Sequence, residues 1–546
     1  MSKIYSAIKN HAEHMPSHKA FTYRAGEQYE SIDYRILREY VDSLAAHLVR
    51  YKGKTVAIIG NNKLEYAVCL LTVLSHIGNA LLIDKELGED DIESIFEHVC
   101  PELILLDNEL NLSFEAHEVM LFSEVCDKMK EKTGFTEDPS FAGDLILHTS
   151  GTTGQPKCVL LQEKNYYSVI PELNRKWGVK PEHSCLFIIP LYHIYALTSL
   201  FHGLYVGIEN IIEWDYKRIG KVLSETKPRL FMGVPLMYNR IMEVAFGKAG
   251  RKLFAALFVS NLLLKIRIDV RSVWFREIHE YFGGNYIFGV SAGSVLPYRT
   301  SRFFNDIGLP VYNVYGMTET AGPVAINYKD HNRYDSVGEI LDNNEVRIEE
   351  PDADGIGRVC VRGRNVFRGY LGERGRAPIV GEAGDAADAG DNTATGKNAA
   401  AGDNATVGDN AVAGDNATVG DNAVAGDNAA VGDNAAVGNF FDTGDLGYIK
   451  DHFLYIIGRR KNILIGENGK NISPEELNQK LLENNRIHDC SVIMEDGKLI
   501  AVVNTDLAVQ EMRRYLDKVN HKLPGYKRIS GFRTTDKMIK KARRWN

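Results

Sequence analysis

The stretch with the clearest chemical potential is LHTSGTTGQPK, residues 147–157, which follows an apolar run. Its glycines let backbone amides approach an anion, its hydroxyls can donate to phosphate oxygens, and Lys157 supplies positive charge. It is not a kinase-type phosphate loop, GxxxxGK[ST], because Gln155-Pro156 precedes the lysine and Cys158 follows it. We expect a phosphate cradle of another kind, although a plain flexible loop has a similar composition.

Short apolar runs that end in Gly, Pro or Asp recur along the chain and would position such a loop. Runs of this kind are typical of buried parallel strands, and helix-like stretches lie between them, as at residues 63–78. Strands that alternate with helices predict an α/β fold with ligand loops at the carboxyl ends of the strands. The runs are residues 55–60, 102–107, 144–149, 185–190, 229–235 and 285–293.

Further motifs follow the phosphate stretch. They are VYGMTETAG (314–322), SVGEI (336–340), GRVCVRGRNVFRGY (357–370), FDTGDLGYI (441–449) and GRRKNILIGENGKNISPEELNQKL (458–481). Together with TSGTTGQPKCV (149–159), these motifs resemble, in type and order, those of the adenylate-forming enzymes. That superfamily contains acyl-CoA synthetases, peptide-synthetase adenylation domains and luciferases. The resemblance covers almost the whole chain, and it is closest to the long-chain fatty acyl-CoA synthetases.

The resemblance implies an α/β protein of two domains. Residues 1–457 would form a large domain of parallel-type sheets layered with helices, plus a β-barrel-like subdomain. Residues 458–546 would form a small, mobile α+β domain with its hinge at Lys461. The implied reaction has two halves: a carboxylate attacks the α-phosphorus of ATP, and a thiol then displaces AMP from the acyl adenylate. The implied cofactors are ATP, Mg²⁺ and coenzyme A.

The resemblance also assigns roles to individual residues. Glu319 matches the magnesium ligand, a hard carboxylate for a hard cation, and Thr318 matches the residue beside the α-phosphate. Asp445 would accept hydrogen bonds from the ribose hydroxyls, because an ionised carboxylate can only accept. His193, in PLYHIYA, matches the Pro-x-x-His segment that lines the carboxylate site. The remaining assignments are the β- and γ-phosphates to Ser150, Thr152, Thr153, Gly154 and Lys157, adenine to Tyr315 and the turn Ser291-Ala292-Gly293, and the ribose to Arg459.

The last residues depart from the family pattern. Family members end near Thr-x-x-Gly-Lys-Ile-x-Arg, whose lysine reaches the acyl carboxylate and the α-phosphate. The corresponding segment here, RISGFRTTDKMIKKARRWN (528–546), has no glycine before a lysine. Matching KARR to the family's Lys-Ile-Lys-Arg makes Lys541 the catalytic residue, and matching RTTDKM with one residue deleted selects Lys537. A solvated basic tail without a catalytic role is the alternative.

We expect the substrate to be a medium- or long-chain fatty acid. Residues 252–274, KLFAALFVSNLLLKIRIDVRSVW, resemble the helical region of long-chain fatty acyl-CoA synthetases. Residues 190–207, PLYHIYALTSLFHGLYVG, lack the acidic anchor that an amino-acid activator would need. Aryl acids are the second choice. The apolar, basic helical span could also contact a membrane surface to collect lipid, although an ordinary core helix fits the same pattern.

A hexapeptide repeat, beginning GDNATV-GDNAVA, runs from Gly402 to Val437. Residues 381–439 contain nine Asp, one Glu and one Lys. This stretch therefore accounts for the chain's net charge of −8. Because the repeat lacks large side chains, it fits a disordered tether. A small aliphatic residue before each Gly-Asp-Asn-Ala also fits a short β-helix. We assign no chemistry to this insert and expect it to decorate the surface of the large domain near the hinge.

Two other functions remain open. A fatty acyl-AMP ligase would load a carrier-protein thiol instead of CoA, and a non-catalytic nucleotide-binding scaffold would use the acidic repeat for interactions. The sequence contains no uncharged apolar run of membrane-spanning length and no signal-peptide centre, and its seven cysteines form no CxxC pair. We therefore expect a cytoplasmic enzyme that binds ATP, a carboxylic acid and a thiol, without nucleic acid or a transmembrane segment.

Overall fold

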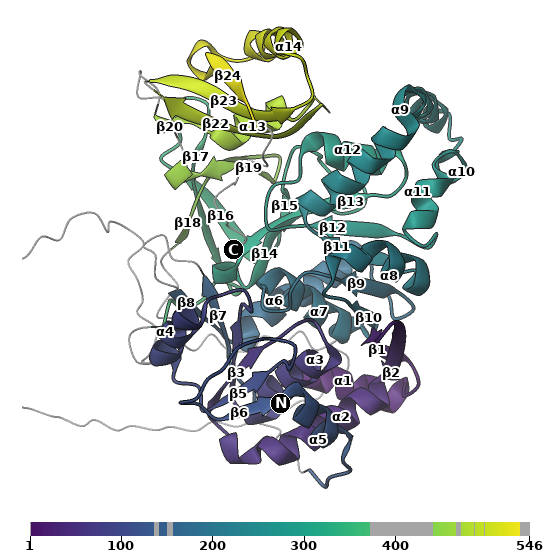
Figure 1. Cartoon of the computed structure of the whole chain (residues 1–546), viewed down its shortest axis with the longest axis vertical. Coiled ribbons are helices and arrows are strands. Elements are labelled where there is room, and N and C mark those ends of the chain that lie inside the picture. Colours follow the sequence, from purple (N-terminus) through teal and green to yellow (C-terminus); the bar gives the residue numbers. More distant parts are fainter. Residues whose placement is uncertain are drawn as a thin grey trace, which may run out of the picture. The chain divides into compact units, whose positions relative to one another are not determined.

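The structure is a computed structural model that describes residues 2–135, 141–149, 157–371, 440–462, 464–465, 471–484, 486–495 and 497–535 (Figure 1). The expected insert at 381–439 and the two C-terminal candidate lysines, Lys537 and Lys541, lie outside these residues. Among the described helices, none combines the length and the apolar content that crossing a bilayer requires.

The first sheet contains the two strands that flank the candidate phosphate loop. Its order is β6-β5-β3-β4-β7-β8, and its strand pairs are parallel except for β7 with β8. The apolar runs at 55–60, 102–107 and 144–149 form β3, β5 and β7 and are largely buried, as expected for parallel strands. The strands are β3 (Thr55–Ile59), β4 (Asn79–Ile83), β5 (Leu103–Leu106), β6 (Val119–Leu121), β7 (Leu145–Thr149) and β8 (Lys157–Leu161).

The second sheet joins a parallel centre to antiparallel strands. Its order is β16-β17-β18-β19-β15-β14-β13-β12-β11-β9-β10-β1-β2, and the pairs from β13 to β1 are parallel. The runs at 185–190, 229–235 and 285–293 form β9, β11 and β12. Strands β14 to β19, where a barrel-like subdomain was expected, continue this sheet. The strands are β1 (Lys19–Ala25), β2 (Gln28–Asp33), β9 (Ser184–Phe187), β10 (Glu209–Ile212), β11 (Leu230–Gly233), β12 (Phe288–Ser291), β13 (Val311–Met317), β14 (Gly322–Ile326), β15 (Gly338–Ile340), β16 (Asn344–Glu349), β17 (Gly357–Gly363), β18 (Phe441–Lys450) and β19 (Phe453–Arg459).

Helices pack against both sheets and help to build a shared core. One hydrophobic cluster contains Ile58 of β3, Leu197 of α7 and Phe187 of β9, so the two sheets enclose the same core. Local sequence sets several helix ends; α9, for example, begins at Pro235, where the missing N–H costs no hydrogen bond. The helices are α1 (Lys3–His14), α2 (Tyr34–Leu48), α3 (Leu64–Thr72), α4 (Glu89–Val99), α5 (Phe122–Lys130), α6 (Glu163–Trp177), α7 (Ile194–Val206), α8 (Ile219–Thr226), α9 (Pro235–Lys265), α10 (Arg271–Trp274), α11 (Arg276–Tyr281) and α12 (Tyr298–Asp306).

The C-terminal part has a hydrophobic core of its own, which includes Leu477, Val492 and Leu516. Its α+β content agrees with the expectation for a small second domain. Strand β19 continues to Arg459, so the expected boundary at 457/458 falls within a strand, and the division at that point stays a prediction. The elements are β20 (Leu464–Ile465), β21 (Asn471–Ile472), α13 (Pro474–Leu481), β22 (Ile487–Glu495), β23 (Lys498–Thr505), α14 (Val509–His521) and β24 (Gly531–Thr534).

The described residues on either side of the insert lie close together. The rings of Phe367 and Phe441 are in edge-to-face contact, with 5.2 Å between their centroids. We expect deletion of residues 402–437 to leave the melting temperature and the adenylation rate nearly unchanged, because loop closure depends weakly on length. A deletion that prevents folding or stops turnover would contradict this prediction.

Candidate active site

Three side chains from distant parts of the sequence meet at the expected phosphate end of the site. Glu319 lies in a short 3₁₀ turn, η4 (Thr318–Thr320), directly after β13. The hydroxyl of Tyr370 donates to Glu319 Oε1 at 2.9 Å. The ammonium group of Lys157, the first residue of β8, lies 5.0 Å from the centre of the Tyr370 ring. The structure thus brings together Lys157 and Glu319, two predicted site residues, through a tyrosine that was not predicted.

The turn that carries Glu319 is fixed by hydrogen bonds on both sides. The hydroxyl of Thr320 accepts from the backbone N–H of Met317 at 3.0 Å and donates to the carbonyl of Gly322 at 2.7 Å. The side-chain amide of Asn365 donates to the carbonyl of Thr320 at 3.0 Å. The turn is therefore held in place by Thr320 and Asn365, which sequence reasoning missed. The sequence signal that could have indicated them is that both lie inside motifs of the family pattern.

Glu319 fits the role of a magnesium ligand. The residue is buried, and among the described residues its Oε2 accepts no hydrogen bond, so that oxygen is available to a cation. The described residues contain no group of three or more His, Cys, Asp or Glu that could hold a metal ion. Mg²⁺ commonly binds through one or two carboxylates together with substrate phosphates, which is the donor set that Glu319 and ATP would provide.

Replacing Tyr370 with phenylalanine tests how Glu319 is held. The variant keeps the ring beside Lys157 but loses the donor to the carboxylate. We expect the ATP–pyrophosphate exchange rate to fall about tenfold, the size of one lost hydrogen bond to a charged group, and the Mg²⁺ requirement to rise. Tyr29→Phe is a matched control, because the Tyr29 hydroxyl donates to Glu213 at 2.6 Å in another part of the fold. Unchanged exchange and unchanged Mg²⁺ dependence in Tyr370→Phe would contradict the role of Tyr370 in holding Glu319.

Three predicted residues meet at the expected nucleoside end. The hydroxyl of Tyr315 donates to Asp445 Oδ2 at 2.6 Å, and Arg459 Nε lies 2.9 Å from Asp445 Oδ1. Burial raises the pKa of Asp445, the nearby charge of Glu319 adds to that rise, and Arg459 and Tyr315 oppose it. Arg459 and Tyr315 thus stabilise the ionised form of Asp445 against the cost of its burial.

Strand β18 has an irregular register opposite Arg358–Cys360, and the residues before Asp445 have a specific backbone conformation there. Gly444 has a φ of +73°, in the left-handed region that favours glycine. The Thr443 hydroxyl donates to the carbonyl of Val359 at 2.8 Å and accepts from the N–H of Asp445 at 3.1 Å. These bonds orient the carboxylate and explain why Thr-Gly precedes the aspartate.

The segment Ser291-Ala292-Gly293 begins with the last residue of β12, in the centre of the large sheet. Ser291 is fully buried, and its hydroxyl has no hydrogen-bond partner among the described residues. Gly293 has a φ of +85°, which permits a sharp turn out of the strand. The place of the turn agrees with the rule that ligands bind beyond the carboxyl ends of parallel strands, and contact with adenine stays a prediction.

His193 lies at the start of α7 beside a second histidine. Its ring packs against that of Tyr192, with 4.6 Å between centroids, and burial lowers its pKa while the charge of Asp84 opposes the change. His148 Nε2 accepts from the backbone N–H of Asp84 at 3.0 Å, and burial lowers the pKa of His148 to about 4. Both imidazoles would therefore be neutral near pH 7 and would offer hydrogen bonds rather than fixed charge to a substrate.

Of the remaining predicted residues, the structure describes only some. Thr318 lies in the same turn as Glu319 and is half-buried, and Lys461, the predicted hinge, lies in an exposed turn after β19. Those outside the described residues are Ser150, Thr152, Thr153, Gly154, Lys537 and Lys541.

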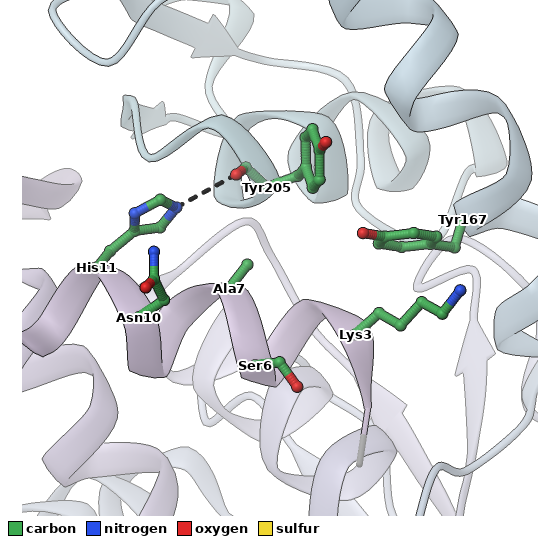
Figure 2. Close-up of a pocket in the computed structure, with 7 residues that line it drawn as sticks. All are labelled: Lys3, Ser6, Ala7, Asn10, His11, Tyr167 and Tyr205. Carbon is green, nitrogen blue, oxygen red and sulfur yellow. Dashed lines mark hydrogen bonds between the residues drawn. The ribbon is translucent and has the colours of Figure 1, made fainter. Parts of the chain in front are cut away.

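A pocket of about 330 Å³ lies beside α1 and contains none of the predicted site residues (Figure 2). The Lys3 ammonium group lies 4.7 Å from the centre of the Tyr167 ring, and a ring nitrogen of His11 lies 3.2 Å from the Tyr205 carbonyl oxygen. The pocket is thus separate from the residues to which the motifs assign chemistry.

Comparison with known proteins decides the family. The family described as AMP-binding enzyme matches residues 8–371, which is more than half of the chain. The chain belongs to the AMP-binding enzyme family. The resemblance inferred from the motifs is therefore confirmed, and the matched range includes strands β1 to β17, the phosphate stretch, Glu319 and Tyr370.

Individual members of the family are only distantly similar. The long-chain-fatty-acid–CoA ligase ACSBG2 of Mus musculus is 23% identical over 536 residues, which cover 86% of this chain and 72% of that protein. The 2-succinylbenzoate–CoA ligase of Bacillus anthracis (strain A0248) is 23% identical over 487 residues, which cover 86% and 82%. Among solved structures, O-succinylbenzoate coenzyme A synthetase (MenE) of Bacillus subtilis, in complex with ATP and magnesium ion, superposes with a TM-score of 0.65 at 20% identity over 97% of this chain and 95% of that chain. This likeness confirms the expected fold class.

Proposed function

We propose that this AMP-binding enzyme activates a medium- or long-chain fatty acid and transfers the acyl group to CoA. The broader activity follows from the family and from the CoA ligases among the relatives. The chain is an AMP-forming acid–thiol ligase, and ATP, Mg²⁺ and CoA are its cofactors. The acyl substrate and the roles of single residues are our proposal.

The assembly of Lys157, Tyr370 and Glu319 is the observation that carries the proposed mechanism. In the first half-reaction a carboxylate oxygen bonds to the α-phosphorus of ATP, and the bond from that phosphorus to the bridging oxygen breaks, releasing pyrophosphate. Lys157 would bind the departing phosphates, and Asp445 would hold the ribose. Mg²⁺ on Glu319 would neutralise phosphate charge. The protein's contribution is thus positioning and electrostatic stabilisation.

In the second half-reaction the thiolate of CoA attacks the acyl carbon of the adenylate. A carbon–sulfur bond forms, the bond between the acyl carbon and the phosphate oxygen breaks, and AMP leaves with one oxygen of the original carboxylate. We assign the switch from the first half-reaction to the second to a rotation of the C-terminal part about Lys461. This residue lies in an exposed turn after β19.

The lining expected for the acyl group supports a fatty acid. Helix α7, which follows His193, carries no Asp, Glu, Lys or Arg, and most of its side chains are buried. The hydroxyl of Tyr195 on α7 donates to the carbonyl of Val290 at 2.9 Å, which ties this apolar helix to the end of β12. A substrate amino group would find no carboxylate on α7, whereas an acyl chain needs none. The fatty-acid ligase among the relatives agrees with this choice.

An aryl acid is the second candidate substrate, because a 2-succinylbenzoate–CoA ligase is as similar to this chain as the fatty-acid ligase. For the acceptor, a carrier-protein thiol is the alternative to CoA. A scaffold without turnover is the alternative to an enzyme, and the intact pairing of Tyr370 with Glu319 and of Tyr315 with Asp445 disfavours it.

An exchange screen separates these functions. ATP–pyrophosphate exchange is measured with saturated fatty acids of graded length, benzoate and 2-succinylbenzoate, and thioester formation is then compared with CoA and with a phosphopantetheinylated carrier protein. We expect exchange to be fastest with medium- or long-chain acids and the thioester to form with CoA. Exchange with aryl acids alone would overturn the substrate assignment, thioester formation with the carrier protein alone would overturn the acceptor, and no exchange with any acid would favour the scaffold.

We propose the cytoplasm as the location of the enzyme. All seven cysteines lie among the described residues and are free thiols, five of them buried. Free buried thiols are common in reducing compartments, where disulfides rarely persist. The expected partners remain ATP, a carboxylic acid and CoA.

A further inference from the structure

The last turns of α9 and the segment after it present apolar side chains to solvent. Phe258 is 74% exposed, Ile266 is 65% exposed and Val273 is 71% exposed, and Leu262 and Trp274 are exposed as well. Figure 1 shows α10 and α11 next to the C-terminal end of α9. Single exposed apolar residues are common, but a continuous group of large ones marks an interaction surface.

The inner face of this region is already packed. Leu253 and Phe275 are buried in one hydrophobic cluster, and Ala256 and Leu257 pack against it. The end of α9 is therefore apolar on two faces, of which one is anchored to the body of the enzyme. The expectation of an ordinary core helix is right for the inner face and wrong for the outer one. The core contacts already fix the helix, so they do not account for the apolar side chains on its outer face.

Basic residues are frequent in the sequence that carries the exposed apolar side chains. Residues 251–276 contain six Lys or Arg and one acidic residue, Asp269, a net charge of +5 in a chain whose total is −8. Asp269 pairs with Arg271 at 2.7 Å, and Arg276 pairs with Glu280, just beyond this range, at 2.6 Å. Lys265 and Arg267 are exposed, and neither forms an ion pair with any residue that the structure describes. Positive charge therefore remains uncompensated beside the most exposed apolar residues.

This combination matches an anionic lipid surface better than a protein. Interfacial helices place large apolar side chains in the boundary between headgroups and acyl chains, and Lys and Arg at the phosphates. The aliphatic stems of Lys265 and Arg267 can lie along the apolar face while their charges reach outward. Protein interfaces, in contrast, are depleted in lysine and in charge at their centres.

We propose that the apolar and basic surface formed by Phe258, Leu262, Ile266 and Val273, with Lys265 and Arg267, docks the enzyme on anionic membranes. Contact is peripheral and reversible, because a few apolar side chains and two free cations contribute to it. The proposal goes beyond the proposed substrate and does not depend on it, since docking requires only a lipid surface. For an enzyme that takes fatty acids, docking would place it at a surface where acyl chains are concentrated.

Vesicle binding of the full chain tests this proposal. Flotation is measured with phosphatidylcholine vesicles that contain about 30% phosphatidylglycerol, and with pure phosphatidylcholine vesicles. We expect at least about tenfold stronger partitioning onto the anionic vesicles, and weaker partitioning at high salt. We expect the variants Phe258→Ser/Leu262→Ser/Ile266→Ser and Lys265→Glu/Arg267→Glu each to lose at least about tenfold in partitioning.

Matched changes elsewhere serve as controls. Val49 and Val509 are both 56% exposed, and Arg513 and Arg514 are exposed on α14. We expect Val49→Ser/Val509→Ser and Arg513→Glu/Arg514→Glu to bind vesicles as the wild type does, and all variants to keep its melting temperature. Three results would overturn the proposal: no preference of the wild type for anionic vesicles, equal binding by the surface and control variants, or a self-association without lipid that the triple serine variant abolishes.

Discussion

Replacing Glu319 with glutamine is expected to lower the rate of ATP–pyrophosphate exchange by about a thousandfold while the protein stays folded. The amide oxygen can still accept the hydrogen bond of Tyr370, which preserves the local packing. The amide lacks the negative charge that a hard cation requires, so the metal would lose its protein ligand beside the phosphates. Exchange assays at several Mg²⁺ concentrations measure both the rate and the metal requirement.

The control for this change is Glu102→Gln, a surface residue that pairs with Lys54 at 3.0 Å. We expect that variant to exchange at the wild-type rate with an unchanged melting temperature. Near-normal exchange by Glu319→Gln, without any increase in the Mg²⁺ requirement, would show that Glu319 does not bind the metal.

Lys541→Ala is expected to slow adenylation by at least about a hundredfold and to leave the second half-reaction nearly unchanged. A lysine beside the developing pentavalent phosphate acts by charge in the first transition state, so its removal should not affect attack by the thiol on a supplied acyl adenylate. The two half-reactions are measured separately, by pyrophosphate exchange and by thioester formation from the acyl adenylate.

The neighbouring lysines decide between the two alignments of the C-terminal segment. Lys540→Ala is the matched control, and we expect it to adenylate normally. If Lys537→Ala is slow and Lys541→Ala is not, the alignment with one deleted residue is the right one. Normal adenylation by both Lys537→Ala and Lys541→Ala would remove the C-terminal lysine from the mechanism.

Much of the fold could be predicted because buried parallel strands have a local signature. The apolar run at 55–60 became β3 (Thr55–Ile59), and the run at 285–293 contains β12 (Phe288–Ser291). The antiparallel strands β16 to β19 have mixed burial and no such signature, so they were expected only through the family resemblance. Local pattern thus predicts the central strands but not the antiparallel strands beside them.

The site could be predicted only in part, for a related reason. The roles of Glu319, Asp445 and Tyr315 were predicted because the motifs that contain them resemble those of the adenylate-forming enzymes. The hydrogen bond from Tyr370 to Glu319 joins residues 51 positions apart, and no periodicity indicates such a pair. The exposed face at the end of α9 could not be predicted for a different reason. Apolar residues occur on both of its faces, and the sequence does not say which face is packed.

In the proposed mechanism, a carboxylate oxygen of the substrate attacks the α-phosphorus of ATP at this site. The most direct test uses the acid that supports the fastest exchange, labelled with ¹⁸O in both carboxylate oxygens, together with ATP, Mg²⁺ and CoA. If the acyl adenylate is the intermediate, each turnover transfers one ¹⁸O to AMP, because the carbon–oxygen bond of the adenylate breaks when the thiol attacks. Mass spectrometry of the nucleotide and phosphate products measures the transfer. Unlabelled AMP, or ¹⁸O in inorganic phosphate with ADP as the nucleotide product, would show that the reaction does not pass through an acyl adenylate.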